Sequence, residues 1–130
     1  HQQLRDELTR IRAELGRDDR DESDAPVQTE LQSHCLAFCA ALSTHHTDED
    51  DDIFPALREA QPELAPAIDK LRDDHIAIAA ILVQIRTLVT RAQTARAAAL
   101  PGLRRELDGL AAIAESHFRY EERVVAGTVS

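Results

Sequence analysis

Residues 64–89 read LAPAIDKLRDDHIAIAAILVQIRTLV, and this stretch gives the clearest indication of the fold. Its apolar residues recur in alternating steps of three and four, the spacing that keeps side chains on one face of an α-helix. We call such a line of residues a seam. This seam comprises Leu64, Ile68, Leu71, His75, Ile78, Leu82, Ile85 and Val89. The stretch therefore predicts a long amphipathic helix with one histidine on its otherwise apolar face.

Three further seams accompany this helix. The first comprises His1, Leu4, Leu8, Ile11 and Leu15, and it stops at Gly16. The second comprises Leu31, Cys35, Phe38, Leu42, His45, Glu49 and Ile53, before Pro55, and a helix start is expected near Pro26. The last comprises Leu103, Leu107, Leu110, Ala114, His117, Glu121 and Val124, after a break at residues 100–102. Four helices with fairly short connections predict an all-α fold, an antiparallel up-down-up-down four-helix bundle forming one domain over residues 1–130.

Composition excludes several classes of function. The 130 residues include 24 acidic and 15 basic side chains, and the net charge is −9. Such a chain is a poor partner for nucleic acid or an anionic membrane. No apolar run approaches the ~20 residues of a membrane span. The two cysteines lie one helical turn apart, a poor geometry for a disulfide, and indicate a reducing, cytoplasmic location.

Six polar residues occupy seam positions that should be apolar. They are His1, His45, Glu49, His75, His117 and Glu121. The spacing HxxxE occurs twice, in the second and in the last helix, and it puts histidine and glutamate on the same face. Each of the four histidines lies about 14 residues, or about 21 Å, from the far end of its seam. In an up-down bundle all four therefore belong to one layer.

This layer predicts a metal site. A buried polar group without a partner costs about 1–3 kcal/mol, and six together would rival the whole stability of a domain. Bound metal removes that cost, because neutral imidazole and carboxylate are its preferred ligands. Four nitrogens and two carboxylates suit two metals bridged by both carboxylates rather than one zinc ion. Mixed His and carboxylate donors favour iron, with manganese second.

The motifs around these residues resemble one known family. They are FCAALSTHHTDED at 38–50 with IFPAL at 53–57, LRDDH at 71–75, HFRYEE at 117–122 and HQQLR at 1–5. Together they resemble the hemerythrin-like (HHE cation-binding) domain over essentially the whole chain. The resemblance implies two non-haem iron ions bridged by Glu49 and Glu121 and by a solvent-derived oxo or hydroxo group. It also suggests His1 and His117 on one iron, and His45 and His75 on the other.

The number of histidines bears on the ligand chemistry. With four imidazoles, each metal keeps about one open position, which indicates dioxygen, peroxide or nitric oxide as the small-molecule ligand. Classical oxygen carriers of the family use five histidines, so reversible oxygen carriage is not expected from four. The candidates for a fifth ligand are His46 and His34. His46 lies about 100° around the helix from His45 and is expected to flank the site. His34 is expected at the surface.

Other reactive side chains are assigned supporting roles. Tyr120 lies beside the seam and either packs at a helix interface or donates a proton near the site. Cys35 is expected to be a small apolar filler, and no feature points to a redox role for Cys39. The acidic residues around Glu49, from Asp48 to Asp52, are expected to form a solvated rim.

Three functions fit this pattern. The first is a di-iron protein that binds or senses dioxygen. The second is a di-iron enzyme that decomposes peroxide or nitric oxide or activates oxygen. The third is an iron-handling or interaction module in which the metal is mainly structural. The sequence does not choose between carrier, sensor and enzyme.

Overall fold

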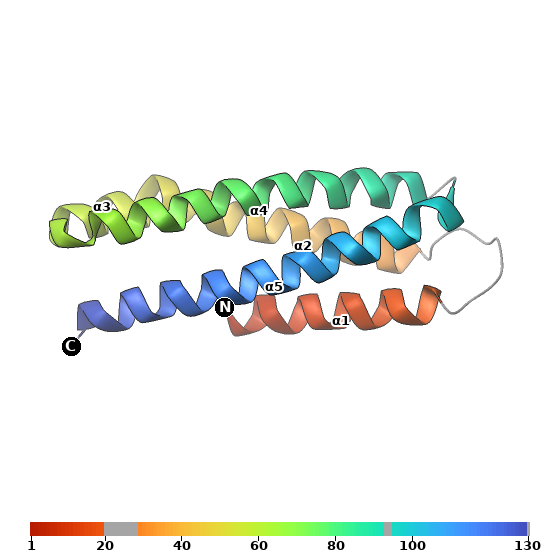
Figure 1. The fold of residues 1–130 in the computed structure, drawn as a ribbon, viewed down its shortest axis with the longest axis horizontal. Helices are drawn as coiled ribbons and strands as arrows, with labels where there is room; N and C mark the ends of the chain where they lie inside the picture. Colours follow the sequence, from red (N-terminus) through yellow and green to blue (C-terminus); the bar gives the residue numbers. More distant parts are fainter. Residues whose placement is uncertain (20–28, 93–94, 130) are drawn as a thin grey trace.

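The computed structural model describes residues 1–19, 29–92 and 95–129, and all elements in these ranges are helical (Figure 1). The long helices are α1 (Gln2–Asp19), α2 (Thr29–Asp48), α4 (Ala65–Ala92) and α5 (Arg96–Val129). Between α2 and α4 lie a π-helix, η1 (Glu49–Ile53), a short helix, α3 (Phe54–Ala60), and a 3₁₀ turn, η2 (Pro62–Leu64). The prediction of an all-helical bundle is confirmed.

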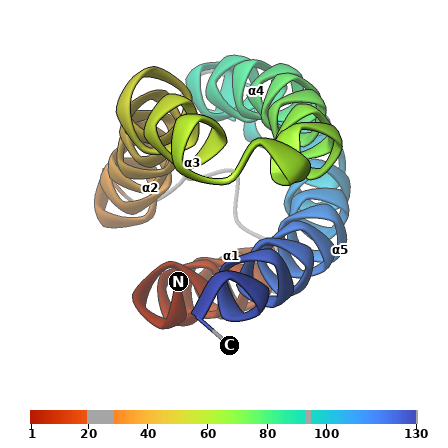
Figure 2. The ribbon, with the colours of Figure 1, turned by 90° about the vertical axis from the view of Figure 1, so that its left-hand side faces the viewer.

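The four long helices surround one apolar core. Helix α4 packs against α5 and α2, while α1 packs against α2 and α5, so the helices form a closed ring (Figure 2). The core is built from the predicted seams, with Leu42, Ile78, Ile85 and Leu110 fully shielded from solvent. Because these side chains are aliphatic and well spaced along each helix, burial of one face is enough to hold the ring together.

Two helix ends differ from the predicted ones. Helix α1 passes through Gly16, and α5 begins at Arg96 and continues through Pro101 instead of starting near Leu103. A proline inside a helix removes one main-chain hydrogen bond. Near the start of α5 this loss is offset by neighbouring alanines, which favour helix, and by burial of Ala99 and Leu100 in the core. Pro26 lies outside the described residues.

The π-helix η1 changes the second seam. The sequence predicts Ile53 on the buried face, but Ile53 is 54% exposed and Phe54 is 2% exposed. The reason is that the Phe54 N–H bonds to the Glu49 carbonyl, five residues back, so the turn contains one residue more than an α-helical turn. The prediction for Ile53 is wrong, and Phe54 is the core residue.

A second, smaller core cluster lies where α3 meets α4. It contains Phe54, Ile68 and Leu71, with Tyr120 of α5 packed against them. Of the two roles considered for Tyr120, the structure therefore supports packing at a helix interface. The cluster closes the end of the bundle next to the histidine layer, since Phe54 also stacks against His75 at a centroid distance of 5.5 Å.

One helical stretch of the described residues, Pro62–Ala92, is long and apolar enough to cross a membrane by length and composition alone. We expected no such stretch from the sequence. A helix in a protein core meets the same criteria, and α4 buries a full seam against α5 and α2. Its apolar character is thus accounted for by its place in the bundle.

The register of the π-helix can be tested by replacing single side chains with alanine. Phe54→Ala should lower the free energy of unfolding by about 3–5 kcal/mol, because a large buried ring is lost. Ile53→Ala is the matched control and should change it by less than about 0.5 kcal/mol. Urea denaturation of both variants measures the difference. A larger cost for Ile53→Ala than for Phe54→Ala would show that the helix keeps the α-helical register.

Candidate metal centre

All the predicted site residues lie in one layer of the bundle. The imidazole centroids of His1 and His45 are 5.3 Å apart, and those of His75 and His117 are 4.9 Å apart. His45, His75 and His117 belong to α2, α4 and α5, and His1 immediately precedes α1, so the layer ties together the four long helices. The four histidines lie at equal distances from the far ends of their seams, and this spacing correctly predicted that they share one layer.

The structure adds a fifth imidazole to the layer. His46 is 6% exposed, and its ring stacks on His75 at a centroid distance of 3.8 Å. The sequence offered His46 as a candidate fifth ligand but favoured a flanking position, whereas in the structure its ring lies inside the layer. A helix in a ring of four faces two neighbours, so two adjacent residues about 100° apart can both point inward. The His-His doublet was the sequence signal for this arrangement.

The side chains form two groups whose ligand atoms lie within 4.8 Å of one another. One group contains His46, Glu49, His75 and His117, and the other contains His1, His45, Glu49 and Glu121. This differs from the pairing that the family resemblance suggested, which placed His117 with His1 and His75 with His45. The bundle geometry explains the difference, because His46 turns toward α4 and joins His75 and His117.

The two glutamates lie between the imidazoles. Glu49 Oε1 is 3.4 Å from the Nε2 atoms of both His45 and His75. Glu121 Oε2 is 3.3 Å from His117 Nε2 and 3.6 Å from His1 Nε2. Each carboxylate therefore faces one histidine of each group. This is the position that a bridging ligand would need.

Three imidazoles have a carboxylate on their outer nitrogen. His75 Nδ1 lies 2.9 Å from Asp50 Oδ1, and His117 Nδ1 lies 3.0 Å from Asp74 Oδ2. His1 Nδ1 lies 3.3 Å from Glu122 Oε2. A proton on Nδ1 satisfies the carboxylate and leaves the Nε2 lone pair free to point inward. The roles of Asp50, Asp74 and Glu122 were not predicted from the sequence, because acidic residues next to a helix seam are usually solvated.

The inward-facing atoms have no hydrogen-bond partner among the described residues. These buried atoms are Nε2 of His45, His46, His75 and His117, Oε1 of Glu49 and Oε2 of Glu121. Buried polar atoms are otherwise nearly always paired, so a set of six around one space is exceptional. They are all lone-pair donors of the kind that divalent cations bind. The residues present therefore fit a metal centre.

Burial sets the charge of the histidines. It lowers the pKa of His46 to about 3, and the nearby His75 and His117 add to the decrease. Burial also lowers the pKa values of His45 and His75. For His117 the nearby Glu121 carboxylate and the hydrogen bond with Asp74 outweigh burial and raise the pKa. Most of the layer is thus neutral imidazole, the form that binds metal.

The two glutamates titrate as a pair. Burial raises the pKa of Glu49, and the neighbouring Glu121 raises it further. Burial also raises the pKa of Glu121, but the neighbouring His117 and Glu49 side chains outweigh this and lower it. Of the two carboxyl groups, Glu49 therefore keeps a proton more readily than Glu121. A cation between the two carboxylates would favour the ionised form of both.

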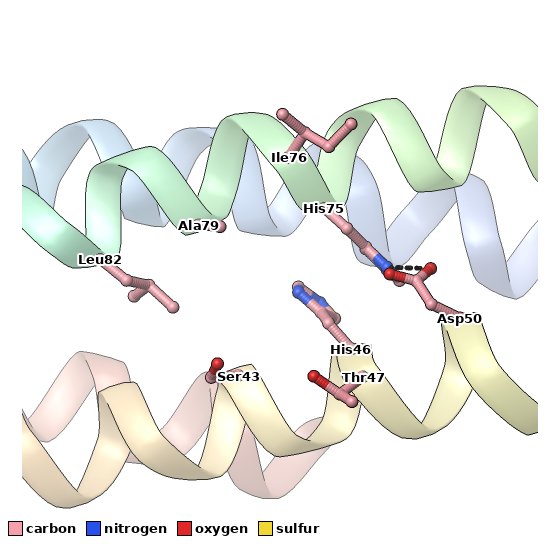
Figure 3. A pocket seen from close by; sticks show the side chains of 8 residues that line it. All are labelled: Ser43, His46, Thr47, Asp50, His75, Ile76, Ala79 and Leu82. Atoms are coloured by element: carbon pink, nitrogen blue, oxygen red, sulfur yellow. Dashed lines mark hydrogen bonds and ion pairs between the residues drawn. The ribbon is translucent and has the colours of Figure 1, made fainter.

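A cavity of about 180 Å³ opens beside the layer between α2 and α4 (Figure 3). Ser43, Thr47 and His46 line it on the α2 side, and His75 and Ala79 line it on the α4 side. Among the described residues no carboxylate lies on the outer nitrogen of His46, in contrast to His75 and His117. Both His46 and His75 border the open space.

The remaining candidates lie outside the layer. His34 pairs with Glu14 at 3.0 Å and is half-buried. Cys35 and Cys39 are free and buried in the apolar core, and burial raises the pKa of both thiols, that of Cys35 to about 12. Cys35 is thus the apolar filler that was predicted. The acidic neighbours Asp48, Asp51 and Asp52 are exposed, as expected of a solvated rim.

The pKa shifts predict how the stability of metal-free protein depends on pH. In the unfolded chain His45, His46 and His75 would titrate near 6.5, whereas in the folded chain their pKa values are lower. These three histidines therefore take up protons on unfolding below pH 6.5, and their contribution to stability should fall as the pH decreases from 7 to 5. The raised pKa values of Glu49 and His117 act in the opposite direction, so comparison with a variant that lacks His46 isolates the histidine contribution.

Melting temperatures of chelator-treated protein at pH 7 and pH 5 measure this effect. His46→Leu removes the group with the lowest histidine pKa and should raise the melting temperature at pH 5 relative to that at pH 7. An unaltered difference between the two temperatures would contradict the assignment of a neutral imidazole to His46.

Comparison with known proteins agrees with the geometry. A family model described as the hemerythrin HHE cation binding domain matches residues 1–129. No curated protein and no solved structure gave a match. The match covers nearly the whole chain, including both groups of His and Glu ligands, and this chain therefore belongs to the hemerythrin HHE cation-binding domain family.

Proposed function

We propose that this domain holds two iron ions and uses them to bind or activate a small oxygen-containing ligand. The observation that carries the proposal is the set of buried, unpartnered Nε2 and carboxylate oxygen atoms that converge in two groups. The donor set is nitrogen and oxygen without thiolate, since both cysteines lie in the apolar core. Such a set favours iron over zinc, with manganese as the next choice.

In this proposal the seven side chains have distinct tasks. His1 and His45 hold one ion, and His46, His75 and His117 hold the other, within the up-down-up-down bundle predicted from the sequence. Glu49 and Glu121 bridge the two ions, because each faces one histidine of either group. Asp50, Asp74 and Glu122 orient the imidazoles from outside. The two iron ions would supply electrons and open coordination positions to the small-molecule ligand.

The fifth histidine changes the expected ligand chemistry. Three imidazoles, two bridging carboxylates and one solvent bridge would fill six positions around one ion. The ion held by His1 and His45 would keep a single open position, so ligand would bind at one end of the pair only. We therefore propose that reversible binding of dioxygen is favoured over oxidation, contrary to the expectation from four histidines. Peroxide and nitric oxide are the other ligands that fit.

The first test is metal content. The purified domain reconstituted with ferrous iron should retain about two iron atoms per chain by elemental analysis. The double variant Glu49→Ala, Glu121→Ala should retain far less, because both proposed bridges are removed. The matched control replaces the exposed pair Glu59 and Glu63 by alanine and should retain two. Full iron content in the Glu49→Ala, Glu121→Ala variant would refute the bridged centre.

The second test concerns His46. We expect ferrous protein to give an absorbance band with oxygen that disappears under vacuum and returns with oxygen. His46→Ala should open a second position and turn this reversible change into rapid, irreversible oxidation in stopped-flow measurements. His34→Ala, in the same helix but paired with Glu14, should behave as the unmodified protein. If His46→Ala and His34→Ala give the same oxygen kinetics, His46 is not a ligand.

A further inference from the structure

One main-chain carbonyl near the start of η1 has lost its helical donor. In an α-helix the Phe54 N–H would bond to the Asp50 carbonyl, but here it bonds to the Glu49 carbonyl. In the wider π register the donor for Asp50 would come from residue 55. That residue is Pro55, which has no N–H. In the observed π register, no main-chain N–H of the helix is therefore in position to satisfy the Asp50 carbonyl.

Arg72 of α4 supplies the missing donor. Its Nη2 atom donates to the Asp50 carbonyl oxygen at 2.7 Å. The Asp50 side chain also reaches α4, since its Oδ1 atom lies 2.9 Å from His75 Nδ1 (Figure 3). Arg72 and His75 are three residues apart and share one face of α4. Asp50 is thus held by α4 through both its main chain and its side chain.

The turn that Arg72 holds carries both carboxylates that meet the His75 ring. Asp50 contacts the outer nitrogen, Nδ1, and Glu49 faces the inner nitrogen, Nε2, at 3.4 Å. Two consecutive residues can reach opposite sides of one imidazole only while the turn keeps its present geometry. A shift back to the α-helical register would move Asp50 and would also take Phe54 out of the core.

We propose that Arg72 is a positioning residue for the candidate metal centre. Its guanidinium replaces the main-chain donor that Pro55 cannot provide, holds the π-helical turn and thereby fixes Asp50 and Glu49 against His75. The link to metal rests on the proposed function. The replacement by Arg72 of the main-chain donor that Pro55 lacks does not require bound metal. The role of Arg72 in the turn and its effect on metal binding can therefore be tested separately.

A double-mutant cycle between these positions tests the proposal. Arg72→Met keeps the aliphatic part of the side chain but removes the donors. Pro55→Ala restores an N–H that can reach the Asp50 carbonyl. The four proteins, with neither, either or both changes, are titrated with Co²⁺, whose visible absorption reports ligand geometry. Urea unfolding of the metal-free proteins gives a second readout that does not depend on metal.

Removal of a direct partner of a metal-binding histidine typically costs 10–100-fold in metal affinity. Arg72 acts one step further out, so Arg72→Met should weaken Co²⁺ binding roughly three- to tenfold and shift the absorption band. In the Pro55→Ala background the same change should cost less than about twofold, because the carbonyl keeps a donor. Equal losses in the two backgrounds would overturn the proposal.

Arg58 provides the matched control. It is also an arginine that pairs with an aspartate, Asp69, and donates to a carbonyl, that of Ala65. It does not contact Asp50, so Arg58→Met should leave Co²⁺ affinity and band position unchanged. A loss as large as that of Arg72→Met would show a general effect of removing charge near the turn, and would count against the proposal.

The remaining outcomes are also decisive. If the protein binds no Co²⁺, the proposed metal function fails, but coupling between Arg72→Met and Pro55→Ala in urea unfolding still supports the role of Arg72 in the turn. If Arg72→Met does not fold, it should fold in the Pro55→Ala background. Failure to fold in both backgrounds, or additive effects on unfolding, would contradict the replacement of a main-chain donor by Arg72.

Discussion

The central constraint on this molecule is a layer of five imidazoles and two carboxylates inside an aliphatic bundle. Lone pairs that face one another without protons or partners are costly, and the surrounding leucine and isoleucine side chains offer no relief. Bound cations would satisfy these atoms and would link the four long helices through the layer. In the metal-free protein, burial raises the pKa of Glu49 and lowers the pKa values of His45, His46 and His75.

Several local features follow from the need to aim these side chains. Carboxylates on the outer nitrogens of His1, His75 and His117 fix the inward direction of the lone pairs. The π-helix inserts one residue just after Glu49, which keeps Phe54 in the core while Asp50 reaches α4. His46 has no such carboxylate among the described residues, and it borders a cavity between α2 and α4 together with His75.

Sequence periodicity predicted the helices and the depth of the histidine layer, because burial of one helix face and a rise of 1.5 Å per residue are properties of every α-helix. It failed where a residue departs from a single straight seam. His46 was placed at the flank of the site because a single seam does not show that a bundle helix faces two neighbours, and Phe54 was missed because a π-helical turn shifts the register. The pairing of histidines depends on which neighbour each ring faces, and one seam does not contain that information.

The most direct test of the centre is diffraction from crystals of iron-loaded protein, with anomalous difference maps calculated at the iron edge. We expect two peaks per chain, one bounded by His46, His75 and His117 and the other by His1 and His45, with Glu49 and Glu121 between them. A single peak, or peaks at the exposed acidic rim and none in the layer, would contradict the bridged pair of ions.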